Sequence, residues 1–452
     1  YTTHRDPVLS MGVGFKVPLT KDPDGHNHIH GNATIDPRSG AAVRADQLKI
    51  GSEWFYPMHY SLNWPWMNLG IFIVGLAALV MLAALVSGVV MHRKVFREFF
   101  TFRPKKHTQR SALDLHNLTG VVALPFHFFF AFTGLVIFGA FYFLPVSQFQ
   151  LKGLHDQHEV VEAAETGLPH QAAGVPAPLA SVDAMVAEAQ RRWAAQGMAG
   201  DVGFLALQHV GDANGYVSVY RAGTDRIALV GDGIHFKAST GELIREDPVP
   251  TATGRVAEFL TGLHLQHFRH WLLRWLYVVG GLAGCVCIAT GFIFFVEKRK
   301  RQHAKQGGQG ARVVDALAVT TVTGMLVATL AMLVANRLLP EVSPAGWPGR
   351  GDLEQYIFWG AWVLAMAHAF LRTGAVAEGK MAPAWREQSW VVAGLAVAAV
   401  VLNWLTTGDH LLRTISAGYW PVAGTDLFML AGALVAVVAA RHLGRRAAAP
   451  VT

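Results

Sequence analysis

Seven long apolar runs constrain the fold of this chain more than any other feature of its sequence. A helix crosses the hydrocarbon core of a bilayer with roughly 20 apolar residues, and these runs are close to that length or longer. Charged residues make up 15% of the chain, whereas soluble domains carry about 25%. The sequence therefore predicts a mainly α, polytopic helical protein surrounded by membrane lipid. The predicted spans are 67–91, 113–143, 270–296, 314–338, 353–371, 388–406 and 424–440.

Basic loops give these spans an orientation. The loops after the first and third spans are rich in Lys and Arg, and such loops stay on the cytoplasmic side. The opposite loops are mixed or acidic, so residues 1–64 and 146–262 are expected outside the cytoplasm. These loops explain the net charge of +7, and no pattern of aromatic and basic residues indicates nucleic-acid binding.

The two polar segments share a pattern. Each ends in a strand, a turn that closes on Gly and a second strand, NATIDPRSGAAV in the first segment and GIHFKASTGELI in the second. In the second segment, SVDAMVAEAQRRWAA predicts an amphipathic helix with Ser181 as its N-cap, and GYVSVYRA and DRIALVGDGIHFKA predict strands. This segment is expected to be an α+β domain. The first segment lacks the helix, so we expect one upstream of Tyr1.

The chain is expected to divide along these lines. The predicted parts are an N-terminally incomplete segment at 1–64, two transmembrane helices within 65–145, the α+β domain at 146–262, a third transmembrane helix within 263–300, and a four-helix membrane extension at 301–452. The extension lacks a paired-histidine pattern. Quinone, a partner subunit or no ligand at all are the alternatives for it.

Two histidines lie in the second apolar run, His116 and His127. On one continuous helix, eleven residues return to within about 20° of the starting direction and rise about 16 Å. The two side chains are therefore expected on one helix face at two depths. An ionisable residue inside a span indicates function, and haem iron held by two histidines suits electron transfer. The pattern predicts two haems.

Each haem needs a second ligand from another helix. His92 ends the first span at a depth similar to His116, and His59 and His264 lie on the outer side with His127. Two of His59, His127 and His264 are expected to hold the outer haem. The alternative for any one of these histidines is a hydrogen bond between helices, and for His92 a place at the membrane surface.

Smaller features surround the histidines. Gly120, Thr133 and Gly134 would let a flat macrocycle or a neighbouring helix approach closely. Asp114 is expected either to orient a ligand imidazole or to cap its helix. Cys285 and Cys287 are interpreted as small apolar filler. Five aromatic residues before and at the first span are interpreted as an interfacial belt, with a docking surface as the alternative: Trp54, Phe55, Tyr56, Trp64 and Trp66.

Over about residues 1–300 the sequence resembles the PepSY-associated transmembrane family. The resemblance is carried by MHYSLNW, LVSGVVMHRKVFREFFTFRP, LDLHNLTGVVALPFH, FTGLVIF and TGLHLQHFRHWLLRWLYVVGGLAGCVCIATGFIFF. The two strand–turn–strand units resemble PepSY modules. The resemblance implies His59 and His264 as outer ligands and His116 as an inner ligand, while His92 and His127 belong to the branch that this chain matches best. Family members usually begin with a His-bearing span that this chain lacks, so the partner of His116 stays open.

Characterised relatives include dihaem ferrisiderophore reductases of the bacterial inner membrane. The resemblance thus implies a multi-pass inner-membrane oxidoreductase with two haem b groups and a PepSY-like domain in the periplasm. Quinol or a cytoplasmic reductant is the expected donor, and a ferric siderophore or other ferric chelate the expected acceptor. No acid–base catalyst is expected. The alternatives are a non-catalytic PepSY partner or regulatory binding protein, and an electron-transfer subunit of a respiratory complex.

Overall fold

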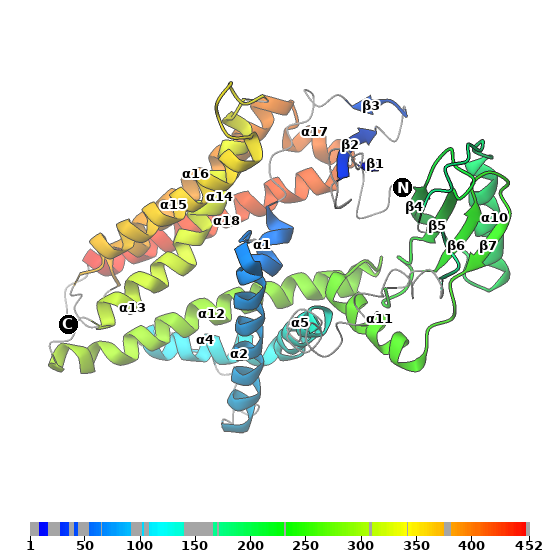
Figure 1. The fold of residues 1–452 in the computed structure, drawn as a ribbon. Helices are drawn as coiled ribbons and strands as arrows, with labels where there is room; N and C mark the ends of the chain where they lie inside the picture. The colour runs from blue at the N-terminus through cyan, green and yellow to red at the C-terminus, as the bar shows by residue number, and fades with distance from the viewer. Residues whose placement is uncertain are drawn as a thin grey trace. The chain divides into compact units, whose positions relative to one another are not determined.

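The computed structural model describes most of the chain, and its described part is mainly helical with two small antiparallel sheets (Figure 1). This architecture confirms the predicted class of polytopic helical membrane protein. The described residues are 9–16, 28–35, 40–43, 54–64, 66–91, 102–103, 108–139, 166–169, 171–229, 232–306, 310–340, 342–374 and 381–448.

Five helices of the described chain are long and apolar enough to cross a membrane, or six if one bent pair forms a single span. The five are Trp66–Met91, Trp271–Arg299, Arg312–Leu338, Pro383–Thr407 and Trp420–Arg445. The span predicted at 353–371 forms a helix, α15 (Arg350–Arg372), but it is not among these candidates. Its first turns carry Arg350, Asp352 and Glu354, which lower its hydropathy.

The second apolar run is broken. It forms α4 (Thr108–Val122) and α5 (Leu124–Ile137), which meet at an angle of 65°. Pro125 explains the break, because its ring displaces the carbonyl four residues earlier and disfavours helical geometry at the preceding residue. The expectation that one continuous helix carries both His116 and His127 on a single face is therefore wrong.

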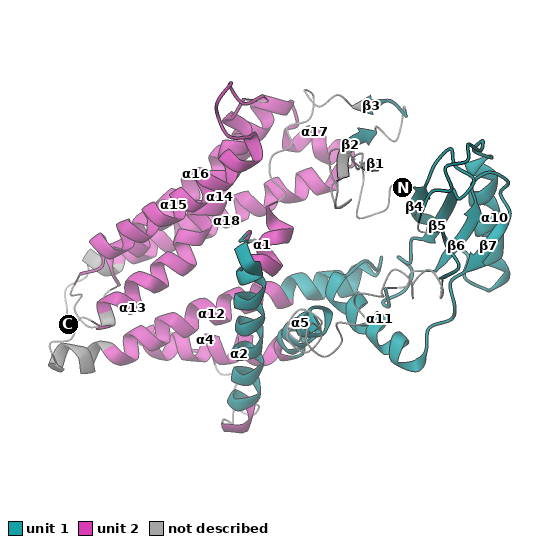
Figure 2. Cartoon of the chain, viewed as in Figure 1, with its two compact units in different colours: residues 1–45, 64–88, 125–279 teal, residues 46–63, 89–124, 280–452 magenta. Residues whose placement is uncertain are grey.

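Two compact units make up the chain (Figure 2). One comprises residues 1–45, 64–88 and 125–279, and the other 46–63, 89–124 and 280–452. Two of the boundaries, at 88/89 and 279/280, fall inside helices, α2 (Leu69–Met91) and α12 (Trp271–Gln306).

The first unit contains an α+β domain. Helix α10 (Val182–Ala195) covers a sheet whose order is β4 (Val202–Gln208), β5 (Tyr216–Arg221), β6 (Gly233–Lys237) and β7 (Leu243–Glu246) (Figure 1). Apolar residues of α10 and the sheet form the core, namely Met185, Ala189, Trp193, Val202, Val217, Val219, Ile234, Phe236 and Ala238.

Local sequence predicts most of this domain. Ser181 caps α10 as predicted, because its Oγ accepts a hydrogen bond from the Ala184 backbone N–H. The β6–β7 hairpin closes on Gly241, whose φ of +77° suits glycine. The strand predicted over DRIALVGDGIHFKA is confirmed at β6, but residues 224–228 before it form turns and bends. The fourth strand of the sheet is β4.

The N-terminal segment of the same unit forms a second sheet. Strands β1 (Leu9–Lys16), β2 (His28–Ile35) and β3 (Ala42–Val43) are antiparallel in that order. Gly40, with φ of +69°, precedes β3. The two strands of the predicted strand–turn–strand unit are therefore confirmed as β2 and β3, and residues 36–39 between them lie outside the described residues.

A helical bundle forms most of the second unit. It contains α13 (Gly310–Val319), a π-helix η3 (Thr320–Gly324), α14 (Met325–Leu338), α15, α16 (Pro383–Thr407), α17 (Leu411–Ser416) and α18 (Trp420–Ala448). Helices α14, α15, α16 and α18 run side by side (Figure 1). Their contacts are rich in alanine, including Ala393, Ala396, Ala433 and Ala436, because small side chains let helices approach closely.

Candidate functional site

His264 is held by a hydroxyl group of a neighbouring helix. It lies in the last turn of α11 (Ala252–Leu265), and its Nδ1 is 2.9 Å from Oγ1 of Thr133 on α5. The Thr133 hydroxyl donates its proton to the Phe129 carbonyl, so its oxygen accepts from Nδ1–H of His264. In this tautomer, Nε2 of His264 carries the lone pair that a metal ion needs.

A glycine lets the His264 ring lie against α5. A Cβ atom added to Gly134 would be 3.1 Å from Cε1 of His264, which is closer than ordinary van der Waals contact. Thr133 is 1% exposed. The ring is thus fixed by a hydrogen bond on one edge and by the helix backbone beneath it.

His116 is held in the same way by α12. Its Nδ1–H donates to the Cys287 carbonyl oxygen at 2.8 Å, and the Cys287 thiol lies 3.4 Å from the same nitrogen. A Cβ atom added to Gly291 would be 3.3 Å from the His116 ring. Here too, the hydrogen bond leaves the metal-binding lone pair on Nε2.

These two histidines share one arrangement on different helices. Each ring lies on a glycine, and each Nδ1 donates to an oxygen of a neighbouring helix. A hydrogen bond on the nitrogen that does not bind metal fixes the tautomer and orientation of a ligand histidine. The donor chemistry of both residues therefore fits an axial ligand of haem iron.

The other three predicted ligands are His127, His59 and His92, and the structure gives less detail about their surroundings. His127 is 3% exposed on α5, and Gly134 lies seven residues later, about 20° around the helix and about 10 Å along it. His127 therefore shares the face of α5 that His264 contacts. His59 is exposed on α1 (Phe55–Ser61). His92 lies outside the described residues.

Asp114 lies inside α4 and does not cap it, and its partners among the described residues are two arginines rather than an imidazole. Its carboxylate is 4% exposed and pairs with Arg103 at 3.0 Å and Arg110 at 3.1 Å. It thus joins the segment around residue 103 to α4. Two guanidinium groups compensate the burial of this charge.

The small residues of the sequence prediction do meet a neighbouring helix. A Cβ atom on Gly120 would lie 3.5 Å from Cys287 Sγ, so α4 and α12 approach closely there. The interpretation of Cys287 as mere filler missed its carbonyl oxygen, which no side-chain pattern could reveal. For Thr133, the signal available in the sequence was a threonine directly before a glycine inside an apolar run.

A Ser–His–Asp series lies in the α+β domain. Ser218 Oγ is 2.7 Å from Nδ1 of His235, and His235 Nε2 is 3.1 Å from Asp247 Oδ1. Ser218 is 2% exposed, so a substrate cannot reach its hydroxyl. The series joins β5, β6 and the segment after β7, and it does not form a hydrolase site. Nearby, burial raises the pKa of the Asp232 carboxyl.

One histidine of the C-terminal bundle, His368, lies in a network of hydrogen bonds. His368 Nε2 is 3.0 Å from Glu387 Oε2, and Gln388 Nε2 is 3.3 Å from His368 Nδ1. Thr323, inside the π-helix, donates to Gln388 Oε1 at 2.7 Å. Both ring nitrogens of His368 are therefore engaged, as expected of a histidine that joins helices.

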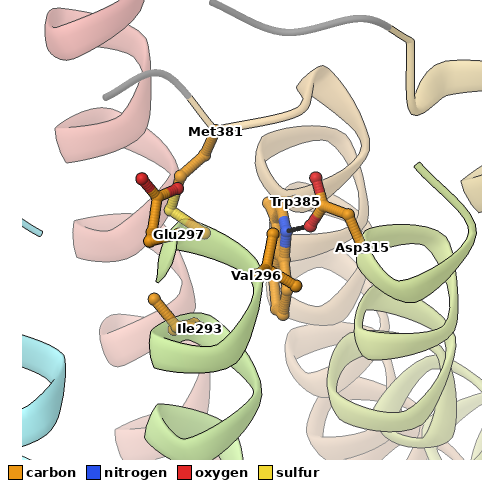
Figure 3. Close-up of a pocket in the computed structure, with 6 residues that line it drawn as sticks. All are labelled: Ile293, Val296, Glu297, Asp315, Met381 and Trp385. Carbon is orange, nitrogen blue, oxygen red and sulfur yellow. Dashed lines mark hydrogen bonds between the residues drawn. The ribbon is translucent and has the colours of Figure 1, made fainter. Parts of the chain in front are cut away.

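A small pocket lies between α12, α13 and α16 (Figure 3). Its lining includes Glu297, Met381 and Trp385, whose indole N–H donates to buried Asp315 at 2.9 Å. The empty space among these side chains is about 210 Å³, open solvent included. Among the described residues, no group of three or more His, Cys, Asp or Glu could hold a metal ion by itself. A haem would need only its axial histidines.

Comparison with known families identifies the chain. The sequence matches the PepSY-associated TM region family over residues 4–298. The chain belongs to this family. The match covers all five predicted ligand histidines of this PepSY-associated TM protein and ends before the helices α13 to α18.

One full-length relative of this PepSY-associated TM protein is the Pseudomonas aeruginosa protein PA4219, itself described as uncharacterised. The two are 27% identical over 402 residues, which is 84% of this chain and 91% of the relative. The aligned part is longer than residues 4–298, so the similarity extends beyond the family match into the C-terminal helices. No solved structure matches the chain.

Proposed function

We propose that this PepSY-associated TM protein is a haem-b oxidoreductase that passes electrons across the bacterial inner membrane to a periplasmic ferric chelate. The observation that carries the proposal is the paired anchoring of His116 and His264. Each donates Nδ1–H to an oxygen of another helix and rests on a glycine. A neutral imidazole that donates through Nδ1 has its lone pair on Nε2, the nitrogen through which it can bind iron.

The chain's own residues would do three things. His116 and His264 would bind iron through Nε2, with His59, His92 and His127 as candidates for the opposite positions. Thr133 and the Cys287 carbonyl would hold the two rings in the orientation that ligation needs. The apolar helices would exclude water. When bound, haem b would supply a one-electron carrier whose iron has no open position for substrate.

The acceptor chemistry follows from the oxidation state of iron. A ferric siderophore or other ferric chelate binds Fe(III) through hard oxygen ligands, which hold Fe(II) less tightly. One electron delivered on the periplasmic side would therefore release the iron. Quinol or a cytoplasmic reductant would supply the electrons.

An optical spectrum of the purified protein, oxidised and dithionite-reduced, with a pyridine haemochrome assay, tests the proposal. We expect a low-spin b-type α-band and two haems per chain. Ala substitutions at His116 and His264 should each remove or alter one haem. His368→Ala is the matched control, because His368 is hydrogen-bonded within the bundle and should leave the spectrum unchanged.

The acceptor is tested separately. Reduced protein is mixed with ferric siderophores, and both haem re-oxidation and capture of Fe(II) by a ferrous chelator are followed. Haem that stays reduced would exclude the siderophore assignment and favour an electron-transfer subunit. A colourless protein, even after haem supplementation during expression, would favour the non-catalytic binding protein.

A further inference from the structure

One aromatic residue of the predicted interfacial belt is buried inside the protein. Phe55, Tyr56, Trp64 and Trp66 are 45–67% exposed, whereas Trp54 is 3% exposed. Four of the five side chains are thus exposed, as an interfacial belt requires, and the interpretation is wrong for Trp54. The indole ring of Trp54 must therefore pack against other side chains of the protein.

That partner is the C-terminal bundle. The Trp54 ring lies 4.2 Å from the ring of Phe358 and 6.1 Å from that of Trp359, both on α15. Ala328 and Met332 of α14 complete the same buried cluster. All of these residues belong to one compact unit, and their bundle positions lie beyond the family match at 4–298.

Helix α1 packs against the bundle through the face that carries Met58. Met58, one turn after Trp54, packs against the same cluster, and side chains four residues apart lie on one face of a helix. The side chain of Asn63, which follows α1, donates a hydrogen bond to the carbonyl oxygen of Trp54, which precedes it, at 3.1 Å. This bond connects the two ends of the helix. His59 is about 140° around the helix from Trp54 and is exposed.

A helix as short as α1 does not form stably by itself in water. Its seven residues therefore depend on the packing of Trp54 and Met58 against α14 and α15. This contact therefore contributes to the position of His59 on α1.

We propose that the C-terminal bundle supports and positions α1. Trp54 and Phe358 are the positioning residues, and they hold His59 where it can serve as an axial ligand. The ligand role of His59 belongs to the proposed function, on which this part of the inference rests. Support of α1 would be a function for the helices beyond the family match that needs neither quinone nor a partner subunit.

The first test follows backbone hydrogen exchange of the α1 segment in haem-free full-length protein. Truncating a buried Phe or Trp removes enough packing free energy that α1 should exchange on the order of a hundredfold faster in Phe358→Ala and Trp54→Ala. Trp385→Ala is the matched control. Trp385 is buried in the same bundle against Asp315, so its loss should leave α1 protected. Phe358→Leu, which keeps the core filled, should show a smaller effect in the same direction.

The second test uses the haem spectrum and midpoint potentials of the same variants. Trp54→Ala and Phe358→Ala should reproduce the change caused by His59→Ala, and the double variant Phe358→Ala/His59→Ala should show no additional change. The His116 haem should keep its signals in all three.

The outcomes separate the two proposals. A wild-type protein without haem overturns the proposed function and the ligand half of the inference together. Wild-type haem that is unchanged in Phe358→Ala, or α1 exchange equal in Phe358→Ala and Trp385→Ala, overturns the inference and leaves the proposed function intact.

Discussion

Replacing Thr133 by valine tests the anchoring of His264 most directly. Thr133 is buried, and its Oγ1 accepts Nδ1–H of His264 at 2.9 Å while its own proton goes to the Phe129 carbonyl. Valine has nearly the same shape but no oxygen. The change therefore removes one acceptor from the histidine ring and leaves the surrounding packing in place.

The size of the effect can be estimated in two ways. Loss of an outer-shell partner of a ligand histidine costs about 10–100-fold in affinity, which is about 1.4–2.8 kcal/mol. Leaving a partly buried N–H without an acceptor costs about 1–3 kcal/mol. Only the first value applies to haem affinity, because the second cost is present in the apo protein as well, so Thr133→Val should weaken haem binding at His264 by one to two orders of magnitude and leave the His116 haem unchanged.

The assay is haem titration of the apo protein, with each α-band assigned beforehand from the His116→Ala and His264→Ala variants. Thr320→Val is the matched control, because Thr320 is also buried and donates to a carbonyl four residues earlier, that of Ala316. Thr133→Ser keeps the oxygen and should restore binding. Equal haem affinity in Thr133→Val and wild type would refute the anchoring argument.

Two further predictions concern the α+β domain and its helix α11. Backbone N–H groups, first that of Asn214, lower the pKa of Asp212, so its stabilising contribution is present above the unfolded pKa of about 3.8 and is lost as pH falls through the folded pKa. Asp212→Asn should therefore speed hydrogen exchange at residues 173–175 at neutral pH and abolish the acid-induced loss of protection that we expect of the wild type; an unchanged acid response would contradict it. Gly262→Ala should lower the free energy of unfolding by at least about 1–3 kcal/mol, because its Cβ would clash with the Ile227 carbonyl. Gly88→Ala meets nothing within 4 Å and should be neutral or stabilising by about 0.5–1 kcal/mol, and thermal unfolding of both variants checks the pair.

Local features of this protein were readable without its structure. Apolar runs near 20 residues dictate helices, because a backbone inside lipid must satisfy its own hydrogen bonds. The Ser181 cap and the turn at Gly241 depend on neighbours within a few residues, so they were predicted correctly. The break between α4 and α5 was also readable from Pro125, but the hydrophobicity of the run concealed it.

The sequence alone determined the family, the helical membrane class and the histidines worth testing, because composition and short motifs carry that information. Only the tertiary structure decided which ring nitrogen is held. Thr133 lies 131 residues from His264, and Cys287 lies 171 residues from His116. The tertiary structure also decided that Trp54 is buried, since an aromatic residue near a span looks the same in sequence whether it faces lipid or Phe358. Contacts between distant segments depend on how the helices pack, and no local pattern encodes that packing.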